Sequence, residues 1–527
     1  MTDTNSLRSV LKFLQTPAKS YDDLAYEPTF KASSIFPIMC GSGMSATISF
    51  MNYWKHKNEI DNVSCVATVR DAQGETIKRD YFQVEQDVHS LKFPEMINES
   101  LDETGEFVGS CEIEIFAIED LKFPYPAVSI FYETTKGVSA VHTASRVFHS
   151  IGDMDHRLMS DIDESGFDIH ADGDQTPFFC FTNGPRPVPD AKILFTAFNA
   201  AGEERVLELP TESLGAYQTR FVFPEEHEEL KTFLQGKVGF CKIRYESFGI
   251  FPRLMCGTMA RDRSQMTLTH SYYDTSGREE YFESDQSGSV RNAYLALPLL
   301  LMDQADLDLS FYPIFSPGEI RLKASVFDGD GKLLGEESDL GRVISPGTQM
   351  VNLNIREMMN RLEIPIEKSS LLSIEGYSHD GRLPTRINFG VNFHAPLKAG
   401  TNINTSMQHA EQFGGPRRTY RWLPAYFRQD LKNYALVTVL GKQIDEDYNA
   451  EVYVQLYTES GMVHTEEMTV RSQTSKMIQL EELLERAHYT AREGEIVWLA
   501  LETDSPYMNA TYLMVSDRGY IGGDHAY

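Results

Sequence analysis

The chain has 527 residues, 41% of them hydrophobic, and its 77 acidic and 48 basic side chains give a formal net charge of -29. A chain this long exceeds a single hydrophobic core, and a typical domain size of about 100 to 200 residues predicts about three to five domains. The negative charge repels phosphate backbones and anionic lipid, which argues against double-stranded nucleic acid as a partner.

The start of the chain lacks the apolar core and cleavage site of a secretory signal, and no run of about 18 apolar residues occurs after it. We therefore expect no membrane span and a cytoplasmic location. The apolar neighbours of the cysteines favour buried, reduced thiols, although Cys180 and Cys241 could instead pair across a sandwich. All the cysteines fall in the first half of the chain: Cys40, Cys65, Cys111, Cys180, Cys241 and Cys256.

The segment from Cys40 to Ala46 matches the G-x-G-x-x-A pattern of dinucleotide-binding loops. The next residues, "TISFMNYW", are typical of a strand and not of the helix that would hold a pyrophosphate. The pattern therefore favours a turn, and we expect no organic cofactor.

One unit of sequence occurs four times, because a glycine recurs at intervals of 128, 129 and 130 residues. Positions nine, seven and five residues before each glycine are apolar, which predicts a strand with one buried face in the same phase in every copy. The glycines are Gly74, Gly202, Gly331 and Gly461, and the apolar positions are Cys65, Ala67, Val69, Ile193, Phe195, Ala197, Leu322, Ala324, Val326, Val452, Val454 and Leu456.

A short oxygen-bearing side chain stands three residues before each of these glycines, namely Asp71, Asn199, Asp328 or Thr458. Such a side chain can bond the backbone of a turn, and glycine accepts the positive φ that closes a hairpin. Asp328 and Asp330 also have the D-x-D spacing of a calcium loop. The other copies lack the second carboxylate, so we interpret this stretch as a turn.

The remaining landmarks of the unit come in a fixed order. A short helix is predicted at residues 94–101, 224–234, 355–362 and 480–487, followed by another alternating strand and a closing hairpin. About seven strands and one helical crossover in about 110 to 130 residues suit an antiparallel sandwich. The fold class predicted is all-β with short crossover helices, as four tandem immunoglobulin-like antiparallel β-sandwich repeats.

The expected organisation is a short N-terminal segment, four β-sandwich repeats and one acidic linker. The segments are an N-terminal segment 1–29, repeat 1 at 30–150, the acidic linker 151–164, and repeats 2, 3 and 4 at 165–275, 280–413 and 416–527.

The first linker contains a metal candidate. Asp161, Asp163, Ser165 and Asp172 stand at positions 1, 3, 5 and 12 of a possible calcium loop, with Gly166 at position 6. Position 12 is the shorter acid, and flanking helices are not indicated. A solvated acidic linker is the favoured alternative, and calcium is the only cofactor that the sequence suggests.

Each closing hairpin ends in a histidine, at His142, His270, His409 and His525. Because the four belong to different repeats, convergence on one centre is not expected. An imidazole at a strand end can bond a backbone group and fix the direction of the chain, and we favour this role over a repeated ligand site.

One basic and aromatic cluster stands out in this acidic chain, at the start of the fourth repeat. Arginine and tryptophan are enriched at binding hot spots, so the cluster is either a partner site or an internal joint against the acidic third repeat. We lean toward the joint. The cluster consists of Arg417, Arg418, Tyr420, Arg421, Trp422 and Arg428.

No nucleophile, zinc-protease, phosphate-loop or CxxC motif is present in the sequence. Repetition multiplies contact surfaces, so the sequence favours a non-catalytic binding or scaffold protein whose ligand is a protein or a glycan, and which could form a homo-oligomer. The alternative is a carbohydrate-active enzyme with carboxylates in an interdomain cleft, since two such groups leave no motif.

Overall fold

The structure is a computed structural model. It describes residues 29–527 apart from residues 42, 94, 98–104, 123–124, 143–144, 149–163, 172–173, 210–212, 227–229, 246, 248, 252, 274–280, 283–291, 313, 315–317, 346–349, 379–382, 385–386, 396–399, 410–418 and 441–447.

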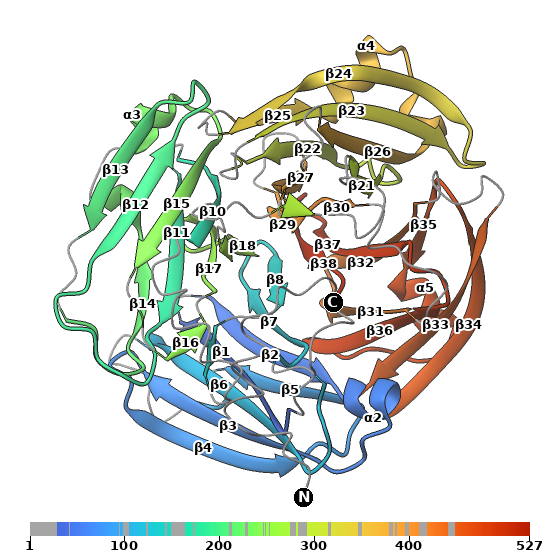
Figure 1. Cartoon of the computed structure of the whole chain (residues 1–527). Helices are drawn as coiled ribbons and strands as arrows, with labels where there is room; N and C mark the ends of the chain where they lie inside the picture. The colour runs from blue at the N-terminus through green and yellow to red at the C-terminus, as the bar shows by residue number, and fades with distance from the viewer. Residues whose placement is uncertain are drawn as a thin grey trace, which may run out of the picture.

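The chain forms paired antiparallel sheets, and the strands of each pair come from one continuous stretch of sequence. Four such sheet pairs succeed one another around a ring, each with an outer and an inner sheet (Figure 1). The predicted all-β sandwich fold is confirmed. The immunoglobulin-like description and the boundaries of four separate domains stay predictions.

The first two sheet pairs are described with the outer sheet first and the strands in spatial order. Pair 1 has β1 (Lys31–Cys40), β6 (Phe107–Ala117), β3 (Val63–Asp71) and β4 (Thr76–Gln83), then β5 (Val88–Phe93), β2 (Ser45–Met51), β7 (Val128–Glu133) and β8 (Val138–His142). Pair 2 has β13 (Glu204–Leu209), β12 (Ile193–Phe198), β15 (Gly239–Tyr245), β10 (Glu164–Ile169) and β19 (Tyr272–Tyr273), then β14 (Thr219–Val222), β11 (Gln175–Thr182), β17 (Met255–Ala260) and β18 (Met266–His270).

The last two pairs have the same plan. Pair 3 has β24 (Leu333–Ser345), β23 (Gly318–Asp328), β26 (Ser369–Ser378), β21 (Asn292–Pro298) and β30 (Gln408–His409), then β25 (Val351–Asn354), β22 (Asp306–Phe311), β28 (Asn388–His394) and β29 (Ile403–Ser406). Pair 4 has β31 (Thr419–Phe427), β36 (Glu495–Thr503), β33 (Asn449–Thr458) and β34 (Gly461–Arg471), then β35 (Thr474–Gln479), β32 (Leu431–Val439), β37 (Met508–Ser516) and β38 (Ile521–His525).

Small elements complete the fold. Two-stranded sheets join β9 (Arg146–Val147) to β16 (Ile250–Phe251) and β20 (Tyr281–Phe282) to β27 (Leu383–Pro384); the helices are α2 (Tyr53–Asn58), α3 (Leu230–Leu234), α4 (Ile355–Arg361) and α5 (Leu480–Arg486), with 3-10 turns η3 (Pro224–Glu226) and η4 (Ile366–Lys368). Helices α3, α4 and α5 lie where the sequence predicts crossovers, whereas most of the segment 94–101 lies outside the described residues.

The repeated glycine hairpin forms as the sequence predicts. In the third copy, Asp328 Oδ1 accepts from the backbone N–H groups of Asp330 and Lys332, each at 2.9 Å, and Gly331 has φ +75°. Asp71 and Asn199 make the same two bonds in their copies. A carboxylate oxygen occupied in this way closes a turn, so the D-x-D spacing reflects turn chemistry.

The cores show how the ring closes. One buried cluster combines apolar side chains of pairs 1, 2 and 4, such as Phe131, Met266 and Tyr426, and a second combines those of pair 3 with residues of pair 4 such as Leu436. Pair 2 has its own cluster around Phe179. Because the last pair packs on the first, the sheet pairs form a closed ring. No helix among the described residues has the length and apolar character needed to cross a bilayer.

Candidate metal centre

Four equivalent inner strands end near the middle of the ring (Figure 1). β8, β18 and β38 end at His142, His270 and His525, whereas β29 ends at Ser406. Strands β8 and β38 approach so closely that a Cβ added to Gly522 would lie 1.9 Å from the carbonyl oxygen of Val138. Glycine is required there by the close approach of two backbones.

His409 is not the counterpart of the other three histidines, because it lies in an outer sheet whereas the other three end strands of inner sheets. His409 lies in β30 and pairs with Ala293, as Tyr273 of β19 pairs with Glu164 in the second sheet pair. The residue three positions before Tyr273 is His270, and the residue three positions before His409 is Ser406. The third sheet pair therefore brings a serine to the strand end.

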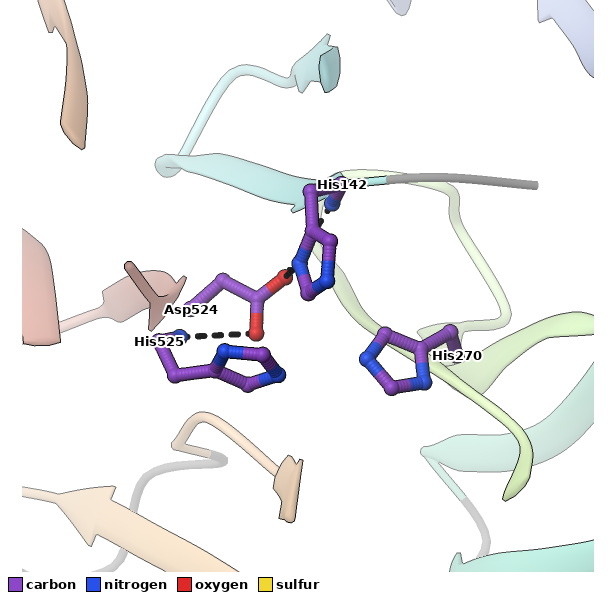
Figure 2. A group of neighbouring side chains, drawn as sticks. All are labelled: His142, His270, Asp524 and His525. Carbon is purple, nitrogen blue, oxygen red and sulfur yellow. Dashed lines mark hydrogen bonds and ion pairs between the residues drawn. The ribbon is translucent and has the colours of Figure 1, made fainter. Parts of the chain in front are cut away.

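The three strand-end histidines converge with one carboxylate. His142, His270, Asp524 and His525 each offer a ligand atom, and these atoms lie within 4.8 Å of one another. The ring centroid of His142 lies 4.8 Å from that of His270 and 4.4 Å from that of His525. Figure 2 shows the three rings turned toward a common point, so the expectation that they stay apart is wrong.

Each imidazole is held through its Nδ1. His142 Nδ1 lies 2.7 Å from Asp524 Oδ2, His270 Nδ1 lies 3.3 Å from the carbonyl oxygen of Ser271, and His525 Nδ1 lies 3.1 Å from that of Ala526. Carbonyl and carboxylate oxygens only accept, so each Nδ1 donates a proton. Two of these bonds are the backbone contacts expected from sequence, and together they leave the Nε2 lone pairs to face the centre.

Burial keeps two imidazoles of the centre in the neutral form that binds a cation. Burial, together with the charge of Arg253 and the neighbouring imidazoles, holds the pKa of His270 well below its ordinary value. Burial and the charge of His142 lower the pKa of His525 to about 4. Both rings are therefore neutral at pH 7, which is the form of histidine that ligates metals.

Asp524 orients the cluster. Burial would raise its pKa, but the positive charge that His142 and His525 carry when protonated, together with the hydrogen bonds from His142, holds it below the ordinary value, so the group is ionised. Its Oδ2 accepts from the backbone N–H and Nδ1 of His142, and its Oδ1 accepts from the N–H of His525 at 2.8 Å. A carboxylate bonded to the far nitrogen of a histidine is the usual support of a metal ligand.

These residues fit a divalent transition metal. Zn–N distances of about 2.0 to 2.1 Å place three nitrogens roughly 3.4 Å apart. The ligand atoms lie within 4.8 Å of one another, so metal binding needs them to approach by at most about 1.4 Å. Imidazole suits zinc, copper, iron and nickel, whereas calcium prefers oxygen ligands. Nε2 of His525 is buried and has no hydrogen-bond partner among the described residues, which is costly unless an ion or another group takes its lone pair.

The calcium candidate does not form a described site. Asp161, Asp163 and Asp172 lie outside the described residues, and Ser165 lies in strand β10. A Cβ at Gly166 would lie 1.5 Å from the carbonyl oxygen of Cys241, so this glycine serves strand packing. An extended strand beginning at Glu164 does not provide the tight loop that wraps a calcium ion.

The basic and aromatic cluster contacts the first sheet pair instead of the third. Arg428 Nη1 lies 3.3 Å from Glu133 Oε1 and donates to the carbonyl of Thr134 at 2.8 Å. Tyr420 and Trp422 are buried and stack at 5.5 Å. The change of neighbour results from ring closure.

Arg421 Nη1 donates to the carbonyl of Tyr420 at 3.0 Å. Arg417 and Arg418 lie outside the described residues. The six cysteines are free and buried, and strand β2 directly succeeds the glycine-rich pattern, as expected from the sequence.

Sequence reasoning missed Asp524 and the meeting of the histidines. The available signal was a histidine at the same place in near-equal units, because a closed ring brings equivalent strand ends to its axis.

No protein-family model matches the sequence, and no curated protein matches it. Among solved structures, the chain is similar to a calcium-binding mutant of Bacteroides uniformis beta-glucuronidase 2, with 8% identity, a TM-score of 0.12, and coverage of 49% of this chain and 28% of that chain. It is also similar to a catalytic domain with two CBM51 domains of Clostridium perfringens ZmpB, with 10% identity, a TM-score of 0.11, and coverage of 92% and 55%. The chain thus spans well under two thirds of either one, and TM-scores this low mean that the molecules do not superpose as wholes.

Proposed function

We propose that this chain is a metal-stabilised binding protein, in which a divalent transition metal, zinc in the first place, joins three of the sheet pairs. His142 of pair 1, His270 of pair 2 and His525 of pair 4 are the ligands. The observation that supports this is the convergence of three Nε2 nitrogens whose Nδ1 protons are all engaged elsewhere.

The ring presents repeated surfaces to a ligand, for which we propose a protein or a glycan. The outer edge strands β4, β13, β24 and β34 occupy the same position in their sheets. Each carries one exposed large apolar residue: Tyr81, Val206, Leu333 and Met462, with 64, 53, 45 and 53% of the side chain exposed. Edge strands with such residues are ready sites for another chain, and four of them allow multivalent contact.

Metal content tests the proposal. Purified protein equilibrated with Zn²⁺ and freed of excess should hold one zinc per chain by mass spectrometry of the metal. The double variant His142→Ala with His270→Ala should hold none. His464→Ala is the matched control, because His464 bonds Glu466 at 2.9 Å on β34, outside the centre. Zinc retained by the double variant, or absent from the wild type, would refute the site.

Chelation tests the metal in the wild-type protein, so this measurement does not depend on whether the variants fold. EDTA should lower the melting temperature of the wild type by several degrees, because a ligand at about 100 times its Kd contributes about 2.7 kcal/mol. The same chelator should leave the melting temperature of the double variant unchanged.

A second pair of experiments tests the binding surfaces. Pull-downs from native lysate and a glycan array are compared between the wild type and a Tyr81→Lys, Met462→Lys variant.

A further inference from the structure

We propose that the metal keeps a fourth, exchangeable coordination position, and that a small exogenous anion occupies it. This inference rests on the proposed metal centre. It concerns a binding site for an anion at a position that no side chain of the described residues fills as a ligand.

Asp524 is committed to its neighbours in the protein. Its Oδ2 lies 2.7 Å from Nδ1 and 3.1 Å from the backbone nitrogen of His142, and its Oδ1 lies 2.8 Å from the backbone nitrogen of His525. Turning an oxygen toward the metal would break at least one of these bonds inside a buried site. Asp524 is therefore a positioning residue that fixes the His142 ring.

The last inner strand of pair 3 does not end in a histidine, unlike those of pairs 1, 2 and 4. Ser406 ends β29 at the place where the other inner strands end in histidine. Its hydroxyl is engaged with the backbone of Ile387, accepting from the N–H and donating to the carbonyl, both at 3.3 Å. The centre therefore offers three nitrogen ligands, which is the ligand number of zinc sites that keep an open position, whereas structural zinc sites have four protein ligands.

The charge balance favours an anion over water at this position. A divalent ion with three neutral imidazoles keeps its full charge of +2, and the buried carboxylate of Asp524 beside His142 offsets half of it. Arg253 adds a further positive charge near the centre, because its backbone N–H and carbonyl both bond the hydroxyl of Ser145 at 3.0 Å, three residues after His142, and its charge acts on His270 and His525. His525 is the one histidine of the three whose residue is only partly buried.

Cobalt provides a visible probe of this position. The protein is loaded with Co²⁺ and titrated with azide while the d–d absorption bands are recorded. A saturable change with a single Kd is expected, because replacing the fourth ligand alters the field at the metal. Arg253→Met should weaken azide at least threefold while one Co²⁺ per chain remains bound, and Arg486→Met on the outer helix α5 is the matched control.

The outcomes separate this inference from the proposed function. Failure to bind Co²⁺ would refute the metal centre itself. Bound Co²⁺ whose spectrum does not respond to azide would overturn the exchangeable position alone. A spectrum that responds only in Asp524→Asn would show that Asp524 fills the fourth position, and this result too would overturn the inference.

Discussion

Trp498 of β36 donates its indole N–H to the hydroxyl of Ser49 of β2 at 3.0 Å, although 449 residues separate them in sequence. Both side chains are buried, with 1% and 0% of their surface exposed. This bond joins the fourth sheet pair to the first, so it reports directly on ring closure.

A double-mutant cycle should show coupling across this joint. Ser49→Ala and Trp498→Phe should each lower the free energy of unfolding by about 1 to 3 kcal/mol, because each substitution leaves the other buried group without its hydrogen-bond partner. The double variant should lose less than the sum, with a coupling energy of about 1 kcal/mol. Strict additivity in urea denaturation would show that the two groups do not interact in solution.

Arg428 should contribute more to the free energy of unfolding than arginines at the surface. Its side chain is largely buried and bonds Glu133 and Thr134 of the first sheet pair. Arg428→Met should lower the free energy of unfolding by about 2 kcal/mol, since Glu133 loses a charged partner. Arg486→Met, at an exposed ion pair with Glu466, should change it by less than about 0.5 kcal/mol. Equal effects would argue against an internal joint at Arg428.

Gly522 tests the close approach of β38 to β8. An added Cβ would meet the backbone of Val138 at 1.9 Å, and neither strand can move without disturbing His142 and His525. Gly522→Ala should cost about 2 to 4 kcal/mol and weaken zinc binding. Gly318→Ala, with open space around the added Cβ, is the control and should be close to neutral. A Gly522→Ala protein with unchanged melting and metal content would contradict the packing.

Asp168 should make the stability depend on pH. It is buried where β10 of pair 2 meets pair 3: Asn392 donates to its Oδ2 at 2.7 Å, and Ser310 and Tyr312 also face it. Burial is the main cause that raises its pKa from 3.8 to about 6, opposed by these hydrogen bonds, while the charge of Asp308 raises it further. His394, which bonds Asp308 at 3.0 Å, is the nearby cation.

The raised pKa determines the sign of the effect. The folded state favours the protonated acid, so this contribution is complete below about pH 4 and is lost as the pH rises through about 6. A shift of about two units corresponds to about 3 kcal/mol. Urea midpoints from pH 4 to 8 should show this decline in the wild type and in Asp339→Asn, an exposed control on β24, but not in Asp168→Asn. Parallel curves for wild type and Asp168→Asn would show that Asp168 is not the cause of this pH dependence.

Limited proteolysis tests the domain boundaries that the sequence predicts. The first cuts should fall in residues 151–164, because the sequence predicts a solvated acidic linker there. Stable fragments that end within residues 66–71 or 322–327 would contradict the boundaries, since these residues lie in the buried strands β3 and β23.

Local features of the fold were predictable because each depends on a few neighbouring residues. Alternating apolar positions define the strands before each hairpin, and Gly74 and Gly331 have the positive φ that the turns require. Helix α2 was not predicted, since "TISFMNYW" is typical of a strand throughout. The strand ends at Met51, and Asn52 then caps the helix by accepting from the N–H of Lys55 at 3.3 Å.

The centre was not predictable in the same way, because its geometry depends on the angles between sheet pairs. Those angles are set by contacts such as Trp498 with Ser49, which no periodicity in the sequence reveals. The misplaced His409 has a related cause. Its strand β30 joins the outer sheet beside β21, whereas the other histidines end strands of inner sheets, and which sheet a strand joins is decided by its neighbours in space.

The contact between His142 and Asp524 spans 382 residues of sequence. A ribosome adding about 5 to 20 residues per second needs roughly 20 to 80 s to make that stretch. During this time the first and second sheet pairs have emerged, while the surface that pair 4 will cover is still bare. Nascent chains of this protein therefore expose an incomplete apolar face for roughly 20 to 80 s, and exposed surface of this kind makes a folding intermediate prone to aggregation.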